Sequence, residues 1–244
     1  MPPVIQLDER RSGNPEGYPS QFQYYDMLVA AFVAVLLISN IVAPKFVAWG
    51  PLRFSGAQLL FPLTYIFGDI FTEVYGYAGS RRAIWNGFFA SALLAVVSSI
   101  VIALPPAPDW PNQKAYETVL GSIPRLVVAS LIAYWVGEFA NSFVMARMKV
   151  MTGGKYLWMR TIGSTAVGQA VDTVLIMVIA FAGVVATSDI IRAIISGYLA
   201  KVLYEIVMTP VTYLVVNKLK RAEGVDIIDR DTDFNPFKSS ITAR

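Results

Sequence analysis

Two carboxylates, Asp69 and Glu73, lie four residues apart in an otherwise apolar stretch, FPLTYIFGDIFTEVYGY at residues 61–77. This spacing puts both side chains on one face of a helix, and Tyr65 lies one turn before Asp69. A charged group near the centre of a bilayer costs roughly 2.5–3.5 kcal/mol on insertion scales, so it normally faces a polar interior. The stretch therefore predicts a membrane helix that lines a site for moving or sensing a polar solute.

Other ionisable residues occur at a similar depth in later apolar stretches. At the rise of a helix, Asp69 lies roughly 17 Å from the outer edge of its span. The same count gives comparable depths for Glu138, Asp172 and Lys201. Amides and a further acid accompany them at helical spacing: Asn141, Gln169 and Glu205. Polar groups that converge near the midplane are what a binding site inside a helical bundle requires.

Ion pairing offers a structural alternative for some of these groups. Lys201 and Glu205 are four residues apart and can neutralise one another within one helix. Arg160 can pair with Glu73 as a clamp at the cytoplasmic edge. One lysine cannot neutralise all three remaining acids, which are Asp69, Glu138 and Asp172. For these three we therefore predict a functional role.

Aromatic residues and glycines surround the acids. Tyr134 and Trp135 precede Glu138; they can serve packing, or they can stack on a planar nitrogenous solute whose N–H groups the acid accepts. Gly68 and Gly137 each stand directly before an acid, where a neighbouring helix or a flat ligand can approach the backbone. The two segments resemble each other, so we expect Asp69 and Glu138 to face each other across a central cavity.

The composition and the apolar runs predict the elements that position these residues. The chain has 244 residues, of which 55% are hydrophobic and 15% charged. The apolar runs predict an all-α integral membrane protein with six transmembrane helices. The expected spans are residues 26–43, 58–75, 83–104, 124–148, 160–187 and 190–217. The chain contains no Cys and no His, so we expect no metal site and no cofactor.

The distribution of Lys and Arg predicts the orientation. Of the 20 basic residues, 14 lie in the two tails and the second and fourth loops. The positive-inside rule then puts both termini in the cytoplasm. We expect a cytoplasmic tail at 1–25, a transporter domain at 26–220, and a loosely ordered cytoplasmic tail at 221–244. The outer loop at 105–123 is expected to connect two spans, with a short surface helix near its end.

Four motifs together resemble the queuosine precursor transporter family of bacterial inner-membrane proteins: FPLTYIFGDIFTEVYGY, GEFANSFVMARMK, RTIGSTAVGQAVDT and KVLYEIVMTP. The resemblance covers residues 26–220. It implies uptake of 7-deazaguanine bases, such as the 7-cyano and 7-aminomethyl compounds, by a bundle similar to vitamin-uptake substrate-binding subunits. It also implies that the motif positions contribute to the site. These are Asp69, Glu73, Glu138, Asn141, Arg160, Ser164, Gln169, Asp172, Lys201 and Glu205.

Two other classes of protein stay open at this point. The chain can be a substrate-binding subunit that needs an ATPase partner, docked on a face of small residues. It can also be an intramembrane enzyme, although catalysis would then rest on carboxylates alone. No nucleotide-binding or nucleic-acid-binding motif is present in the sequence. The expected partners are a small base, the lipid bilayer and a second copy of the chain, because a six-helix bundle is small for a complete alternating-access transporter.

Overall fold

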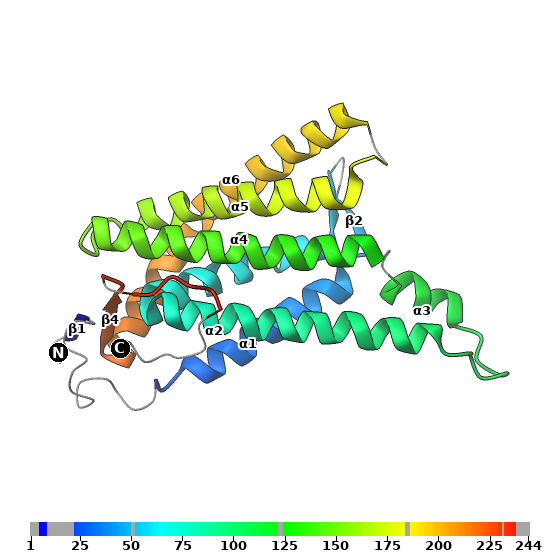
Figure 1. Ribbon diagram of the computed structural model, residues 1–244, viewed down its shortest axis with the longest axis horizontal. Coiled ribbons are helices and arrows are strands. Elements are labelled where there is room, and N and C mark those ends of the chain that lie inside the picture. Colours follow the sequence, from blue (N-terminus) through cyan, green and yellow to red (C-terminus); the bar gives the residue numbers. More distant parts are fainter. Residues whose placement is uncertain are drawn as a thin grey trace.

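The computed structural model describes residues 5–8, 22–49, 52–121, 124–183, 186–230 and 232–237. Helices dominate this part of the chain (Figure 1). They are α1 (Tyr25–Val42), α2 (Phe61–Ala103), α3 (Gln113–Leu120), α4 (Pro124–Met151), α5 (Leu157–Phe181) and α6 (Thr187–Glu223), with a short 3-10 turn at Gly56–Leu59. The strands form two small pairs. β1 (Ile5–Asp8) runs parallel to β4 (Val225–Ile228), and β2 (Phe46–Trp49) runs antiparallel to β3 (Leu52–Ser55).

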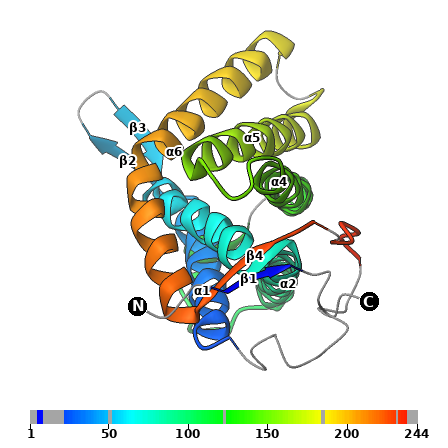
Figure 2. The same ribbon diagram turned by 90° about the vertical axis from the view of Figure 1, so that its left-hand side faces the viewer.

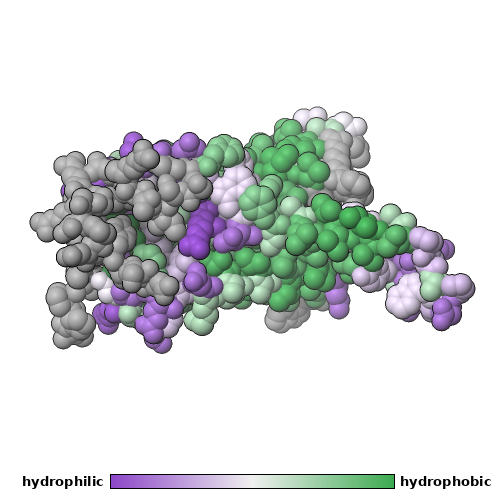
Figure 3. All heavy atoms as spheres, turned by 60° about the horizontal axis from the view of Figure 1, so that its bottom comes forward, coloured by the Kyte–Doolittle hydropathy of each residue, from purple (hydrophilic) through white to green (hydrophobic). Residues whose placement is uncertain are grey.

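Within the described ranges, five helices are long and apolar enough to cross a membrane: α1, α2, α4, α5 and α6. Their outer faces expose large apolar side chains, such as Leu93, Leu203 and Leu214. Figure 3 shows this apolar surface as a broad band, with hydrophilic residues toward the ends of the molecule. An exposed apolar band of this extent is stable in lipid rather than in water. The prediction of an all-α integral membrane protein is therefore confirmed.

Helix α2 contains two of the six expected spans, and it reverses direction between them. Gly76 has φ 71° and ψ 178°, which is not helical. The helix follows β3 and leads into α3, and both neighbours lie at the same end of the molecule (Figure 1). We call residues 61–75 the first arm and residues 77–103 the second arm. A carboxylate of the C-terminal segment supports the turn, because Asp229 accepts the backbone N–H of Tyr77 at 3.1 Å.

Gly76→Ala should destabilise the protein by at least about 2 kcal/mol. The backbone conformation is open almost only to glycine, at a cost of about 1–3 kcal/mol for other residues. A Cβ atom at this position would also lie 2.8 Å from Cγ2 of Ile227. Thermal unfolding of the purified protein in detergent measures the loss. Gly153→Ala is the matched control, because Gly153 also has a positive φ but nothing within 4 Å of its Cβ position. Equal losses for both variants would contradict the packing argument.

Glycines also bring α4 and α5 into close contact. A Cβ atom on Gly137 of α4 would lie 2.8 Å from Cβ of Asp172, and one on Gly168 of α5 would lie 2.7 Å from Cβ of Asn141. Neither position therefore has room for a larger residue. The expectation that a neighbouring helix approaches Gly137 is confirmed. The contact sets the spacing of two helices that both carry predicted site residues.

Two segments near the start and the end of the described chain, β1 and β4, lie together at one end of the bundle. β1 pairs with β4 there, as Figure 2 shows from that side. The segment after β4 packs on the second arm of α2: the indole N–H of Trp85 donates to the carbonyl of Pro236 at 2.7 Å, and the hydroxyl of Tyr77 donates to the carbonyl of Phe234 at 3.0 Å. The expectation of a loosely ordered C-terminal tail is wrong for residues 225–230 and 232–237, because apolar and aromatic side chains hold them against the helices.

The connection between α2 and α4 matches its prediction. α3 (Gln113–Leu120) is a surface helix whose residues are not buried. It lies at the opposite end of the molecule from β1 and β4 (Figure 1).

Candidate functional site

Inside the bundle, four predicted acids and one lysine form a group that we call the polar ring: Asp69, Glu138, Asp172, Lys201 and Glu205. The first arm of α2, α4, α5 and α6 each contribute to it. A Cβ atom on Gly68 would lie 3.3 Å from Oε2 of Glu138, so Glu138 of α4 points at the backbone beside Asp69. Asp69 and Glu138 therefore lie on neighbouring helices close to each other, while their placement across a central cavity stays a prediction.

The ring continues from α5 to α6 through an ion pair. The ammonium of Lys201 lies 2.6 Å from Oδ2 of Asp172 and 3.4 Å from the hydroxyl of Thr173. Glu138 interacts electrostatically with both Asp172 and Lys201. For Lys201, the sequence left open a pairing with Glu205 within α6, and the ion pair described here is with Asp172 of α5. Lys201 reaches across to α5, and Glu205 faces α2.

Asp69 and Glu205 close the ring. Each side chain is only 1% exposed. The two carboxyl groups lie within hydrogen-bonding reach of each other. Among the described residues, no N–H or O–H group of a third residue donates to any of their four oxygens. They are the most deeply buried acids of the ring.

Further polar atoms near the ring also lack a partner within the described ranges: Oδ1 of Asn141, Oε1 of Gln169 and the indole Nε1 of Trp135. Buried polar groups of folded proteins are rarely left without a hydrogen bond. Most of these unpaired atoms are acceptors, and the ring has one ammonium for four carboxyl groups. The arrangement therefore favours a small solute that is rich in hydrogen-bond donors.

The other predicted site residues are placed as follows. Tyr134 is partly buried against the core, and its hydroxyl is 3.4 Å from the carbonyl of Ile84. Trp135 packs edge-on against Trp85, with ring centroids 5.6 Å apart. Ser164 is buried and donates to the carbonyl of Thr161 at 3.1 Å. Tyr65 lies on the first arm of α2, but its side chain falls outside the described part of the structure.

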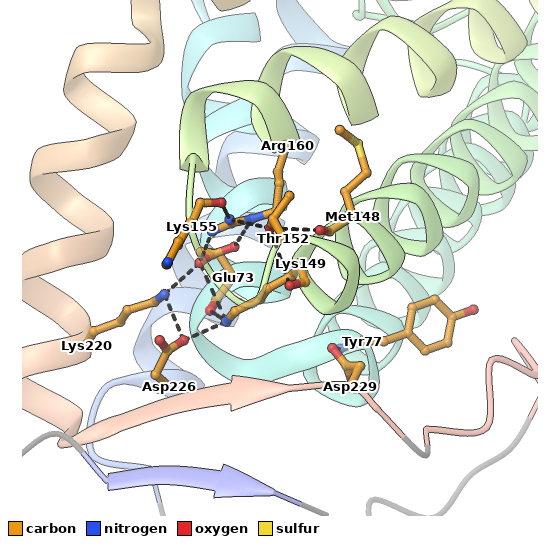
Figure 4. Close-up of polar contacts among 10 residues, drawn as sticks. All are labelled: Glu73, Tyr77, Met148, Lys149, Thr152, Lys155, Arg160, Lys220, Asp226 and Asp229. Atoms are coloured by element: carbon orange, nitrogen blue, oxygen red, sulfur yellow. Dashed lines mark hydrogen bonds and ion pairs between the residues drawn. The ribbon is translucent and has the colours of Figure 1, made fainter.

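A second set of charges, which we call the Glu73 cluster, fills the end of the bundle near β4 (Figure 4). Its members are Glu73, Lys149, Arg160, Lys220 and Asp226. Oε1 of Glu73 lies 2.7 Å from Nη2 of Arg160, 2.6 Å from the ammonium of Lys220 and 3.5 Å from that of Lys149. The side chains of Glu73 and Lys149 are 0% exposed. One carboxylate thus joins α2 to three other helices, α4, α5 and α6.

Asp226 of β4 completes the cluster from the C-terminal segment. Its Oδ1 lies 2.6 Å from the ammonium of Lys149 and 2.8 Å from that of Lys220. Burial alone would raise the pKa of Asp226, but Lys149 and Lys220 outweigh it and hold that pKa below its usual value. At Asp229 the balance is reversed. Burial raises its pKa, and the hydrogen bonds from Thr232 and from the N–H of Tyr77 only partly oppose this effect.

The sequence indicated the pair of Glu73 and Arg160 but not the rest of the cluster. From the sequence, we expected Lys149 and Lys220 to be basic residues of a loop and of a tail. The helical spacing indicates which face of the helix each lysine lies on. Lys149 follows Asn141 and Met145 at intervals of four residues, and Lys220 follows Val216 at the same interval. Each lysine therefore lies on the buried face of its helix. Asp226 carried no such signal, because its position depends on strand pairing between the two ends of the chain.

The geometry agrees with comparisons to known proteins. A family model described as "Putative vitamin uptake transporter" matches residues 55–215. The chain is 29% identical over 176 residues to a protein of Bacillus subtilis (strain 168) named "Probable queuosine precursor transporter", which covers 72% of this chain and 77% of that protein. No solved structure matches the chain. The family is one of transport proteins rather than enzymes. The matched region holds the whole polar ring and most of the Glu73 cluster, and the chain belongs to this family of vitamin uptake transporters.

Proposed function

We propose that this protein takes up queuosine precursors across the cytoplasmic membrane of a bacterium, and that the polar ring binds them. The family and the name of the Bacillus subtilis relative support a transporter for such compounds. The solutes of this proposal are 7-deazaguanine bases such as 7-cyano-7-deazaguanine and 7-aminomethyl-7-deazaguanine. The observation that carries the proposal is the excess of buried acceptors over donors in the ring.

A deazaguanine is complementary to such a ring. One edge of the base presents an N1–H and a 2-amino group, which a single carboxylate can accept together. We assign this role to Glu138, because Asp172 is already paired with Lys201. The 6-oxo group needs a donor, which the amide of Asn141 or Gln169 can supply. An aminomethyl substituent would bring a cation to a second carboxylate, such as Asp69.

The proposal includes a topology. The two arms of α2 each cross the membrane, which gives six crossings with α1, α4, α5 and α6. Both termini lie in the cytoplasm, because most of the basic residues lie in the tails and in the loops of that side. The pairing of β1 with β4 supports a common side for both ends of the chain. The assembly of this proposal is a homodimer, and light scattering of the purified protein would measure the number of chains.

Binding to the purified, detergent-solubilised protein tests the function directly. The ligands are the 7-cyano and 7-aminomethyl deazaguanines, with guanine and riboflavin as comparators. We expect a deazaguanine to raise the unfolding temperature more than either comparator, because a bound solute stabilises the folded state. Stabilisation by riboflavin alone, or by none of the four, would contradict the proposal.

A further inference from the structure

The pair formed by Asp69 and Glu205 is not explained by the binding of a base alone. Both side chains are 1% exposed, and they come from different helices, the first arm of α2 and α6. A carboxylate can accept hydrogen bonds but cannot donate them. Two carboxyl groups within reach of each other therefore form a hydrogen bond only when one of them carries a proton.

Among the described residues, the charged groups with the largest effect on Asp69 do not include a cation that would replace this proton. The charged groups that act on Asp69 are Glu205 of α6, Glu73 of its own arm and Glu138 of α4, and all of them are acidic. The ionisable residues of α5 are Arg160 and Asp172, and they are paired with Glu73 and Lys201. Residues 27–43 of α1 contain no ionisable side chain, and neither does the 3-10 turn at Gly56–Leu59. Asp226 of β4 belongs to the Glu73 cluster, and Asp229 directly after β4 lies beside it.

We propose that Asp69 and Glu205 form a proton-binding site, and that the proton crosses the membrane together with the solute. Repulsion between two buried carboxylates without a cation is costly, and a shared proton removes it. Intramembrane carboxylates that face a bundle interior often serve as proton relays. The second half of the inference, the coupling to a solute, rests on the proposed function.

Charge explains why proton and solute should move together. With all four acids ionised, the polar ring has a large excess of negative charge over the single ammonium of Lys201. A proton on the Asp69–Glu205 pair lowers this excess. A transporter that closes around its solute buries the ring further, where each net charge is more expensive. The protonated, loaded protein is therefore the state that can expose the site to the other side.

The proton site itself can be tested without any solute. Infrared difference spectra would compare the purified protein with the double variant Asp69→Asn/Glu205→Gln at neutral pH. We expect the difference to contain the carbonyl stretch of a protonated carboxylic acid. Asp109→Asn, in an exposed loop, is the control and should leave that band unchanged. A difference that contains only bands of ionised carboxylates would overturn the proton site.

Coupling is tested in proteoliposomes with the membrane potential clamped at zero and the radiolabelled 7-cyano compound outside. A pH gradient of one unit is worth about 1.4 kcal/mol per proton, so an acidic exterior should accumulate the solute up to about tenfold inside. In the double variant, the pH gradient should drive no accumulation of the solute. Accumulation that persists in the variant, or an intact protein that does not respond to the gradient, would overturn the coupling.

The two assays separate the inference from the proposed function. If no deazaguanine enters the vesicles under any condition while the infrared band is present, the proposed solute is wrong and the proton site stands. If uptake occurs and the band is absent, the solute is right and the proton site is wrong. Should the double variant fail to fold, the response of the intact protein to the gradient still decides the coupling.

Discussion

Glu138→Gln should weaken deazaguanine binding by about 10- to 150-fold, the equivalent of about 1.5–3 kcal/mol for a hydrogen bond to a charged group. A glutamine presents one acceptor oxygen where the carboxylate presents two, and its amide N–H groups oppose those of the base. Asp172→Asn should reduce uptake as well, because it also leaves the ammonium of Lys201 without its ion pair. Equilibrium binding and proteoliposome uptake measure the two effects.

Insertion must be separated from binding in this experiment. Both variants should appear in the membrane in normal amounts, because each replaces an intramembrane acid by an uncharged residue. Asp109→Asn is a matched control, since Asp109 lies in an exposed loop far from the ring. Near-native uptake by both Glu138→Gln and Asp172→Asn would show that the polar ring is not the binding site.

Glu73→Gln should destabilise the protein by about 3–5 kcal/mol, the usual cost of removing one partner from a buried ion pair. Glu73 faces three cations, Lys149, Lys220 and Arg160, and is itself 0% exposed. After the substitution, Asp226 is the acid of the cluster that remains to balance them. Thermal unfolding in detergent measures the loss.

The control for this prediction is Glu117→Gln on α3, where the carboxylate is exposed and accepts one hydrogen bond from Gln113 at 2.9 Å. Its effect should be within about 0.5 kcal/mol of zero. Adding Arg160→Gln to Glu73→Gln should cost less than the sum of the two single losses, because it removes a cation that the first change left unpaired. Additive losses, or an unfolding temperature unchanged by Glu73→Gln, would show that the cluster is not a unit.

Hydrophobic patterning accounts for what the sequence predicted well. Apolar runs located the membrane helices, and the polar segment between two of them indicated the surface helix α3. Gly68 and Gly137 indicated where helices approach closely. Patterning along one helix does not reveal which helix lies opposite, and the partner of an acid depends on that. From the sequence, Glu205 was therefore a candidate partner for Lys201, because it lies four residues further along the same helix. In the structure, Lys201 of α6 forms an ion pair with Asp172 of α5.

Contacts between distant parts of the chain could not be predicted either, because the pattern within one segment does not reveal which segment packs against it. Lys149 looked like a residue of a basic loop, yet it is fully buried, because α4 continues to Met151 and carries it into the Glu73 cluster. The C-terminal segment looked polar and unstructured. Its apolar residues Val225, Ile227 and Ile228 are buried, and its acids Asp226 and Asp229 have specific partners in the helices. The local sequence does not reveal these contacts.

The composition of the Glu73 cluster has a consequence for synthesis of the protein. The first arm of α2 leaves the ribosome with two acids, while the cations that balance Glu73 follow 76, 87 and 147 residues later. When the first arm is synthesised, the charge of Glu73 makes its insertion into the membrane costly. In the complete chain, the three cations neutralise that charge. Glu73 gains its full set of cations only after Lys220 has been translated, so a chain that stops before Lys220 leaves Glu73 incompletely neutralised.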